Sequence, residues 1–137
     1  KIDIQGPDAA AFLDFVYINR FSTLKPGRVR YGLMLREDGH VLDDGTTARL
    51  APDHFVMTTT TAAAGLVMRH LEFVHQALCP QFDVRFISVT EQWAQFAIAG
   101  PKSRDLLNSL LETPLSESAF GFMAQDFPHK YRTFCAV

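Results

Sequence analysis

Two adjacent carboxylates, Asp43 and Asp44, are the side chains of this sequence best suited to chemistry. They lie in a stretch, residues 40–50, whose alternation predicts a β-strand. Neighbouring residues of a strand point to opposite faces of its sheet, so the two acids must be separated. Parity places Asp44 on the face of Leu42, and any hairpin register that preserves the pleat puts both beside Tyr31. The pattern predicts an acid and a phenol within a buried apolar row.

Burying the Asp44 carboxylate beside leucines costs several kcal/mol unless it is hydrogen-bonded. A hydroxyl such as that of Tyr31, backbone amides or a polar ligand could supply the bonds. A second interpretation stays open, in which a β-bulge shifts the alternation so that Asp43 faces inward and Asp44 is solvated. Tyr31 alone is more typical of a core aromatic than of a ligand contact.

A run of four threonines, Thr58–Thr61, ends one predicted strand and precedes a predicted helix. The hydroxyls and amides of Thr59 and Thr60 could present hydrogen-bonding groups to a small polar molecule. The simpler interpretation is β-branched strand residues followed by a helix cap at Thr61, and the residues alone favour it.

Other reactive groups lack the spacing that chemistry requires. His70 and His75 are five residues apart, whereas two ligands on one helical face need a spacing of three or four, so no metal site is predicted. Cys79 ends an apolar helix face, where a thiol usually only packs. The Gly100–Lys102 segment lacks the further glycines of a dinucleotide-binding loop.

The elements that position these residues follow from periodicity and turn signals. In chain order they are a strand at 1–5, a helix at 9–18, strands at 28–36, 40–50 and 54–59, a helix at 62–78, strands at 83–89 and 93–99, and a helix at 102–111. An Asp-Gly turn at 37–39 joins the second and third strands. This order predicts an α+β fold, an antiparallel sheet with helices on one face, most simply in a ferredoxin-like arrangement.

Composition limits the classes of partner. A length of 137 residues with 47% apolar residues and twelve Phe predicts one packed core. A net charge of -2 without a basic block argues against nucleic acid, and no apolar run is long enough to span a membrane. Two cysteines without CxxC spacing suit a reducing, cytoplasmic compartment.

Several segments together carry a resemblance to known families. The hairpin segments YGLMLREDG at 31–39 and VLDDGTT at 41–47 resemble the glycine-cleavage aminomethyltransferase family. The segments MTTTT at 57–61, HLEF at 70–73 and SVTEQWAQ at 88–95 resemble the carboxy-terminal part of sarcosine oxidase alpha subunits. With GPDAA at 6–10 and AGPKSR at 99–104, the resemblance covers about residues 1–112.

The resemblance implies a site and a domain division. Residues 1–112 would form an aminomethyltransferase-like folate-binding subdomain, and residues 113–137 a connecting segment or the start of the next subdomain. The family's acid falls on Asp44, the expected catalytic residue, and its hairpin tyrosine falls on Tyr31. A further family tyrosine is replaced by Ala48, and an asparagine-containing segment by Thr59 and its neighbours, which favours the oxidase branch.

The implied cofactor is tetrahydrofolate, contacted by Tyr31, Asp44, Thr59 and Thr60. The implied reaction transfers the one-carbon unit of an imine intermediate from sarcosine oxidation to tetrahydrofolate, giving 5,10-methylenetetrahydrofolate. The flavin and NAD of the parent enzyme would bind outside this chain, so the isolated chain should not oxidise sarcosine. The expected protein partners are the other sarcosine oxidase subunits of the parent enzyme. Two alternatives remain: a glycine-cleavage aminomethyltransferase fragment and a non-catalytic folate-binding or assembly module.

Overall fold

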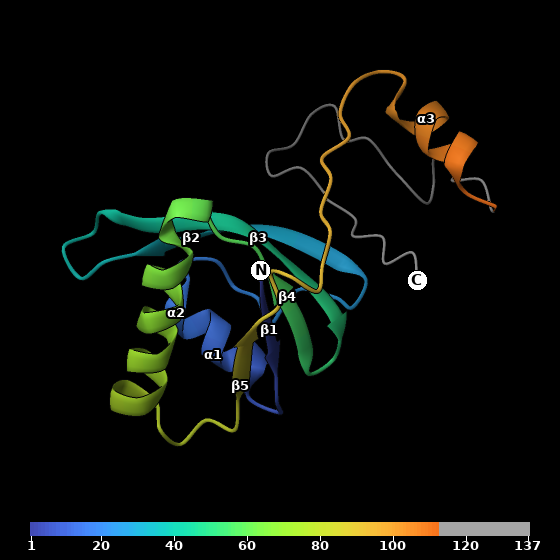
Figure 1. Ribbon diagram of the computed structural model, residues 1–137. Helices are drawn as coiled ribbons and strands as arrows, with labels where there is room; N and C mark the ends of the chain where they lie inside the picture. The colour runs from blue at the N-terminus through green and yellow to red at the C-terminus, as the bar shows by residue number, and fades with distance from the viewer. Residues whose placement is uncertain (113–137) are drawn as a thin grey trace.

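A five-stranded sheet forms the centre of the computed structural model, which describes residues 1–112 (Figure 1). The segment expected to connect to a next subdomain, 113–137, lies outside the described residues. The elements are β1 (Ile2–Gln5), α1 (Ala9–Val16), β2 (Arg28–Leu35), β3 (Val41–Ala51), β4 (His54–Met57), α2 (Ala64–Phe73), β5 (Arg85–Ser88) and α3 (Ser103–Leu110). The strand order is β2-β3-β4-β1-β5, and every neighbouring pair is antiparallel.

The connections confirm the predicted α+β class. Strands β4 and β5 both pair with β1, which lies between them, so they run parallel to each other and α2 joins them as a crossover. This is the split βαβ unit of a ferredoxin-like fold. Strands β2, β3 and β4 form an antiparallel meander, so β3 and β2 extend the sheet by two further strands beyond β4.

Helices α1 and α2 cover one face of the sheet, here called the inner face. Ile4 of β1 and Phe55 of β4 are opposite each other in the register and are fully buried there. Phe12 of α1 stacks on Phe86 of β5 with ring centroids 5.6 Å apart. The same core includes Leu13, Met34, Met57, Val67 and Leu71. The opposite sheet face, here called the outer face, is not covered by α1 or α2.

The helix predicted at 62–78 is divided in three. A 3-10 turn at Thr61–Ala63 precedes α2, and a π-helical turn at Val74–Leu78 follows it. The expectation that Thr61 caps the helix is wrong, because Thr61 is already the first residue of the 3-10 turn and no threonine side chain caps it. The apolar spacing identified the helical path but could not distinguish its pitch.

The strand predicted at 93–99 is also wrong. Residues 93–99 have no regular structure, and the amides of Gln92 and Trp93 both donate to the Val89 carbonyl in a turn directly after β5. Phe96 is 84% exposed. The alternating pattern has high strand propensity, but a strand also needs a hydrogen-bonding partner, and this segment pairs with none of the described strands.

One glycine allows β3 to approach the chain beyond β4. A Cβ built on Gly45 would lie 2.1 Å from the carbonyl oxygen of Thr58, which real side chains do not tolerate. Gly45 follows the acid pair directly, so the absence of a side chain there lets the Thr58 backbone lie against the acid-bearing strand.

Substitution of this glycine should therefore destabilise the fold. We expect Gly45→Ala to lower the free energy of unfolding by about 3 kcal/mol or more, because the methyl group would force two backbones apart. Gly65→Ala is the matched control, since Gly65 lies in α2 with nothing within 4 Å of the added Cβ. It should raise stability by about 0.5–1 kcal/mol. Urea unfolding measures both, and equal effects would contradict the close approach.

Candidate functional site

The two acids occupy opposite faces, but in the reverse of the predicted order. Asp43 is 5% exposed and points to the inner face, where its register partner Met34 is also buried. Asp44 is half-buried on the outer face opposite Leu33. The prediction that Asp44 lies in the buried row is therefore wrong, whereas its placement on the same face as Tyr31 is correct.

The physical reason lies in β2, which has apolar residues on both faces. Met34 fills the core on the inner face, and Gly32 on the same face leaves room for an aromatic ring. A Cβ on Gly32 would lie 2.8 Å from the ring of Tyr17. The inner face of β2 is therefore buried although it carries only Gly32 and Met34 there. Tyr17 and Phe21, from the segment after α1, fill the space that the glycine leaves.

A β-bulge is present but does not decide which acid is buried. Met34 pairs with Asp43, whereas the next residue, Leu35, pairs with Val41, so Leu42 is the extra residue. Leu42 leaves the outer row and packs against the core. The alternative interpretation was correct that Asp43 faces inward, although the acid pair itself lies in a regular part of the register.

On the outer face, Tyr31, Asp44, Thr46 and Thr58 form a cluster that we call the outer polar row. The Tyr31 hydroxyl donates a hydrogen bond to Oδ2 of Asp44. Thr46 lies directly across from Tyr31 in the register, and its Oγ1 is 3.0 Å from Oγ1 of Thr58. Tyr31 is 39% exposed, so a ligand on the outer face could reach the row.

The threonine run is tied to β3 at successive points. The Thr58 amide donates to the Thr46 carbonyl at 2.8 Å, and the Thr46 amide donates to Oγ1 of Thr58 at 3.0 Å. The Thr60 amide then donates to both carboxylate oxygens of Asp43, each at 3.2 Å. Residues 58–60 therefore continue alongside β3 after β4 ends at Met57.

Two of the four predicted site residues are brought into direct contact, and two are not. Tyr31 and Asp44 are hydrogen-bonded, whereas Thr60 contacts Asp43 on the other face through its amide. Thr59 is half-buried between these attachments, and its hydroxyl takes no part in them. Thr46 and Thr58 were not predicted as site residues. Thr46 could have been found, because it is two residues from Asp44 in the strand and therefore lies on the same face.

The loop after α1 fixes β2 at the level of this site. The Asn19 side chain accepts a hydrogen bond from the Leu33 amide at 2.8 Å, and the Ile18 amide donates to the Leu33 carbonyl at 3.1 Å. Leu33 also pairs with Asp44 across the hairpin. The strand is therefore held on both edges where the acid emerges.

Beneath the site, on the inner face, lie two buried hydroxyl groups. Tyr17 is 6% exposed, and burial raises the pKa of its hydroxyl well above the ordinary value, with the charges of Asp43 and Asp44 acting in the same direction. The nearby Thr47 hydroxyl partly opposes this rise in the Tyr17 pKa. Thr47 is fully buried, and its Oγ1 has no hydrogen bond of normal geometry within residues 1–112.

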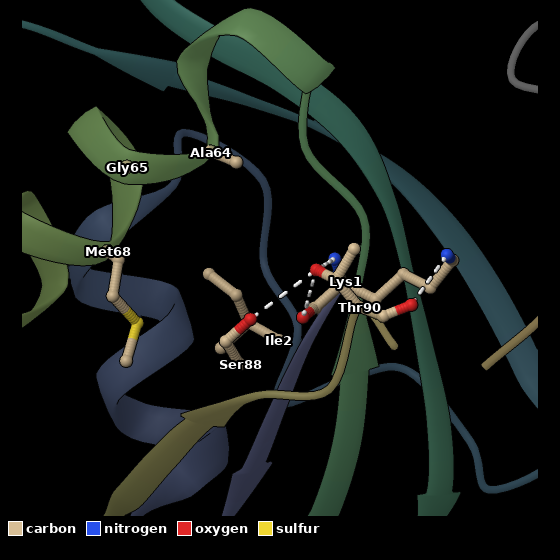
Figure 2. Close-up of a pocket in the computed structure, with 7 residues that line it drawn as sticks. All are labelled: Lys1, Ile2, Ala64, Gly65, Met68, Ser88 and Thr90. Atoms are coloured by element: carbon tan, nitrogen blue, oxygen red, sulfur yellow. Dashed lines mark hydrogen bonds between the residues drawn. The ribbon is translucent and has the colours of Figure 1, made fainter. Parts of the chain in front are cut away.

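A separate hollow of about 240 Å³ lies where α2 begins, against β1 and β5 (Figure 2). Figure 2 shows Met68 on one side and Ile2 with Ser88 on the other. The Thr90 hydroxyl there accepts a hydrogen bond from the backbone nitrogen of Lys1 at 2.9 Å. No carboxylate of residues 1–112 lines this hollow, so the outer polar row is the better candidate for acid or electrostatic chemistry.

The described residues limit other kinds of site. No group of three or more His, Cys, Asp or Glu within residues 1–112 could hold a metal ion. None of the helices in this part of the chain is long and apolar enough to cross a membrane.

Comparison with known proteins defines the family. The family model of the GCVT N-terminal domain matches residues 1–129, so the chain belongs to that family. It is similar to the sarcosine oxidase subunit alpha of Rhizobium meliloti (strain 1021), with 58% identity over 124 residues. The corresponding subunit of Corynebacterium sp. (strain P-1) is 48% identical over 125 residues. Each alignment covers 90% of this chain and 13% of the relative.

More distant similarity reaches the aminomethyltransferases. That of Thermotoga maritima is 30% identical over 117 residues, which are 85% of this chain and 31% of the enzyme. The crystal structure of glycine cleavage system aminomethyltransferase T from Bartonella henselae matches with a TM-score of 0.58 and 29% identity, over 63% of this chain and 23% of that one. The chain therefore spans between about an eighth and a third of the proteins it matches.

The buried phenol predicts a specific alkaline sensitivity. The folded chain should retain the Tyr17 proton at a pH where the unfolded chain, with a tyrosine pKa of about 10, releases it. Stability should therefore fall as the pH rises above about 10. Tyr17→Phe should make the decline in melting temperature between pH 9 and 11 shallower than in the wild type. Identical slopes would show that Tyr17 does not stay protonated inside the fold.

Proposed function

We propose that this chain is the tetrahydrofolate-binding region of a sarcosine oxidase alpha-type subunit. In this role it presents folate to the imine produced by sarcosine oxidation, and 5,10-methylenetetrahydrofolate is formed. The observation that carries the proposal is the Tyr31–Asp44 hydrogen bond on the accessible outer face. Its support is the 58% identity to a sarcosine oxidase alpha subunit and the match to the GCVT N-terminal domain.

Asp44 would act by electrostatics and positioning. Its carboxylate can accept hydrogen bonds from N–H groups of the pterin and stabilise positive charge on the imine carbon. The Tyr31 hydroxyl donates to one carboxylate oxygen and so leaves the other free to face the ligand. Thr59 and Thr60 would complete the contacts at the end of the outer polar row.

The reaction balances without an added oxidant. A folate nitrogen attacks the carbon of the protonated imine, and the second folate nitrogen displaces the amino group, which leaves as glycine. Two protons pass from the folate nitrogens to the departing amine. The flavin, the nicotinamide cofactor and the other subunits would belong to the remaining parts of a cytoplasmic parent enzyme, since this chain spans only 13% of the alpha subunits it matches.

A glycine-cleavage-type aminomethyltransferase is the second candidate, favoured by the structural match to the Bartonella henselae enzyme. The parent polypeptide would distinguish the two, because flavin- and nicotinamide-binding segments belong only to the oxidase. If the chain were instead a non-catalytic folate-binding module, it would bind tetrahydrofolate, and a change of Asp44 would leave the rate of transfer in the parent enzyme unchanged.

The proposal predicts a selective defect in the complete parent enzyme. Asp44→Asn keeps the side-chain shape but removes the charge, so folate-coupled transfer should fall by roughly tenfold or more. Sarcosine oxidation should be retained, because its flavin would lie elsewhere. Separate assays of sarcosine consumption and 5,10-methylenetetrahydrofolate formation measure the two steps.

Asp38→Asn provides the matched control. Asp38 lies at the tip of the same hairpin, paired with Arg36 and away from the outer polar row. The same chemical change there should leave transfer unchanged. Normal transfer by the Asp44→Asn enzyme, or an equal defect in both variants, would refute the assignment of Asp44.

A further inference from the structure

Asp43 is a buried carboxylate that accepts hydrogen bonds from a backbone amide, that of Thr60. It is 5% exposed, and within residues 1–112 the Thr60 amide donates a hydrogen bond to both of its carboxylate oxygens. No Lys, Arg or His of this part of the chain forms a salt bridge with it. Burying a charge without a cation is unfavourable, so a leucine or methionine would fill this core position at lower cost.

The segment that Asp43 holds is the last stretch of chain before α2. Thr58 is attached to Thr46 by hydrogen bonds of both its amide and its hydroxyl, and it lies against Gly45, which has no side chain to obstruct it. Thr60 is the next attached residue, and a 3-10 turn begins at Thr61. Asp43 is therefore the final attachment between β3 and the chain before it turns into the helix.

The same strand connects this attachment to the outer polar row. Asp43 and Asp44 are adjacent, and an extended strand sends them to opposite faces. Asp43 thus fixes Thr60 from the inner face at the position where Asp44 emerges on the outer face. The half-buried Thr59 lies between two attached residues and has little freedom to move relative to the row.

We propose that Asp43 is a positioning residue that holds residues 59–60 beside the outer polar row through the Thr60 amide, and so determines affinity for folate rather than the rate of transfer. This inference rests on the proposed function. Asp43 touches no ligand in this account. Its contribution passes through a backbone hydrogen bond that a change of the Thr60 side chain would preserve.

The test compares two substitutions of Thr60 in the complete parent enzyme. Thr60→Ala and Thr60→Pro both lose the hydroxyl, but only proline lacks the amide N–H that donates a hydrogen bond to Asp43. The Thr60 φ of -58° already suits proline, so this backbone angle need not change in the exchange. We expect the KM for tetrahydrofolate to be about tenfold higher for Thr60→Pro than for Thr60→Ala, with kcat within about twofold.

Variants of Asp43 test the same bond from the acceptor side. Asp43→Leu should raise the KM for tetrahydrofolate by about tenfold and speed hydrogen exchange of the peptide covering residues 58–63, whereas Asp43→Asn, which keeps an acceptor oxygen, should retain most of the affinity. Thr47→Val is the control, because it alters a buried neighbour that has no part in the attachment. It should leave both the KM and the exchange unchanged.

The possible failures are distinguishable. A wild-type parent enzyme without folate-coupled transfer would refute the proposed function, while the exchange measurement would still test the attachment. Normal transfer with equal KM values for Thr60→Pro and Thr60→Ala would overturn the inference alone. A lower melting temperature of Asp43→Leu with an unchanged KM would likewise show that Asp43 only stabilises the fold.

Discussion

The alternation of side chains along β3 is the constraint on which the candidate site depends. It sends Asp43 to the inner face and Asp44 to the outer face, so two chemically identical neighbours have different environments. The buried acid is bonded to the Thr60 amide, and the outer acid is bonded to the Tyr31 hydroxyl. One acid can therefore hold the backbone while the other remains accessible to a ligand.

Packing around the hairpin makes this arrangement specific. Gly32 admits the ring of Tyr17 on one side of the hairpin, and Gly45 admits the backbone of Thr58 on the other. The loop after α1 bonds to Leu33 on the free edge of β2. A one-residue change of register would exchange the faces and place Asp44 in the core, and these close contacts oppose it.

Much of the fold could be predicted from local sequence patterns, because apolar spacing and turn residues determine where helices and hairpins form. The spacing of apolar residues predicted α1, and Gly39, with φ of +82°, forms the Asp-Gly turn expected between β2 and β3. Residues 93–99 have a similar alternation but no partner strand, and pairing is a tertiary property that the pattern does not contain.

The candidate site was predictable in part for the same reason. Parity and register correctly placed Tyr31 and Asp44 on one face. They could not identify the buried face, because the aromatic rings that cover Gly32 come from another segment of the chain. The bond from Thr60 to Asp43 spans 17 residues, so no local pattern could reveal it.

The central claim is the division of roles between the two acids, and a crystal structure of the complete parent enzyme with a bound reduced folate tests it most directly. We expect the pterin on the outer face, with its N–H groups within hydrogen-bond distance of the Asp44 carboxylate, while Asp43 still accepts a hydrogen bond from the Thr60 amide. A pterin bonded to Asp43, or a folate bound away from the outer polar row, would contradict it.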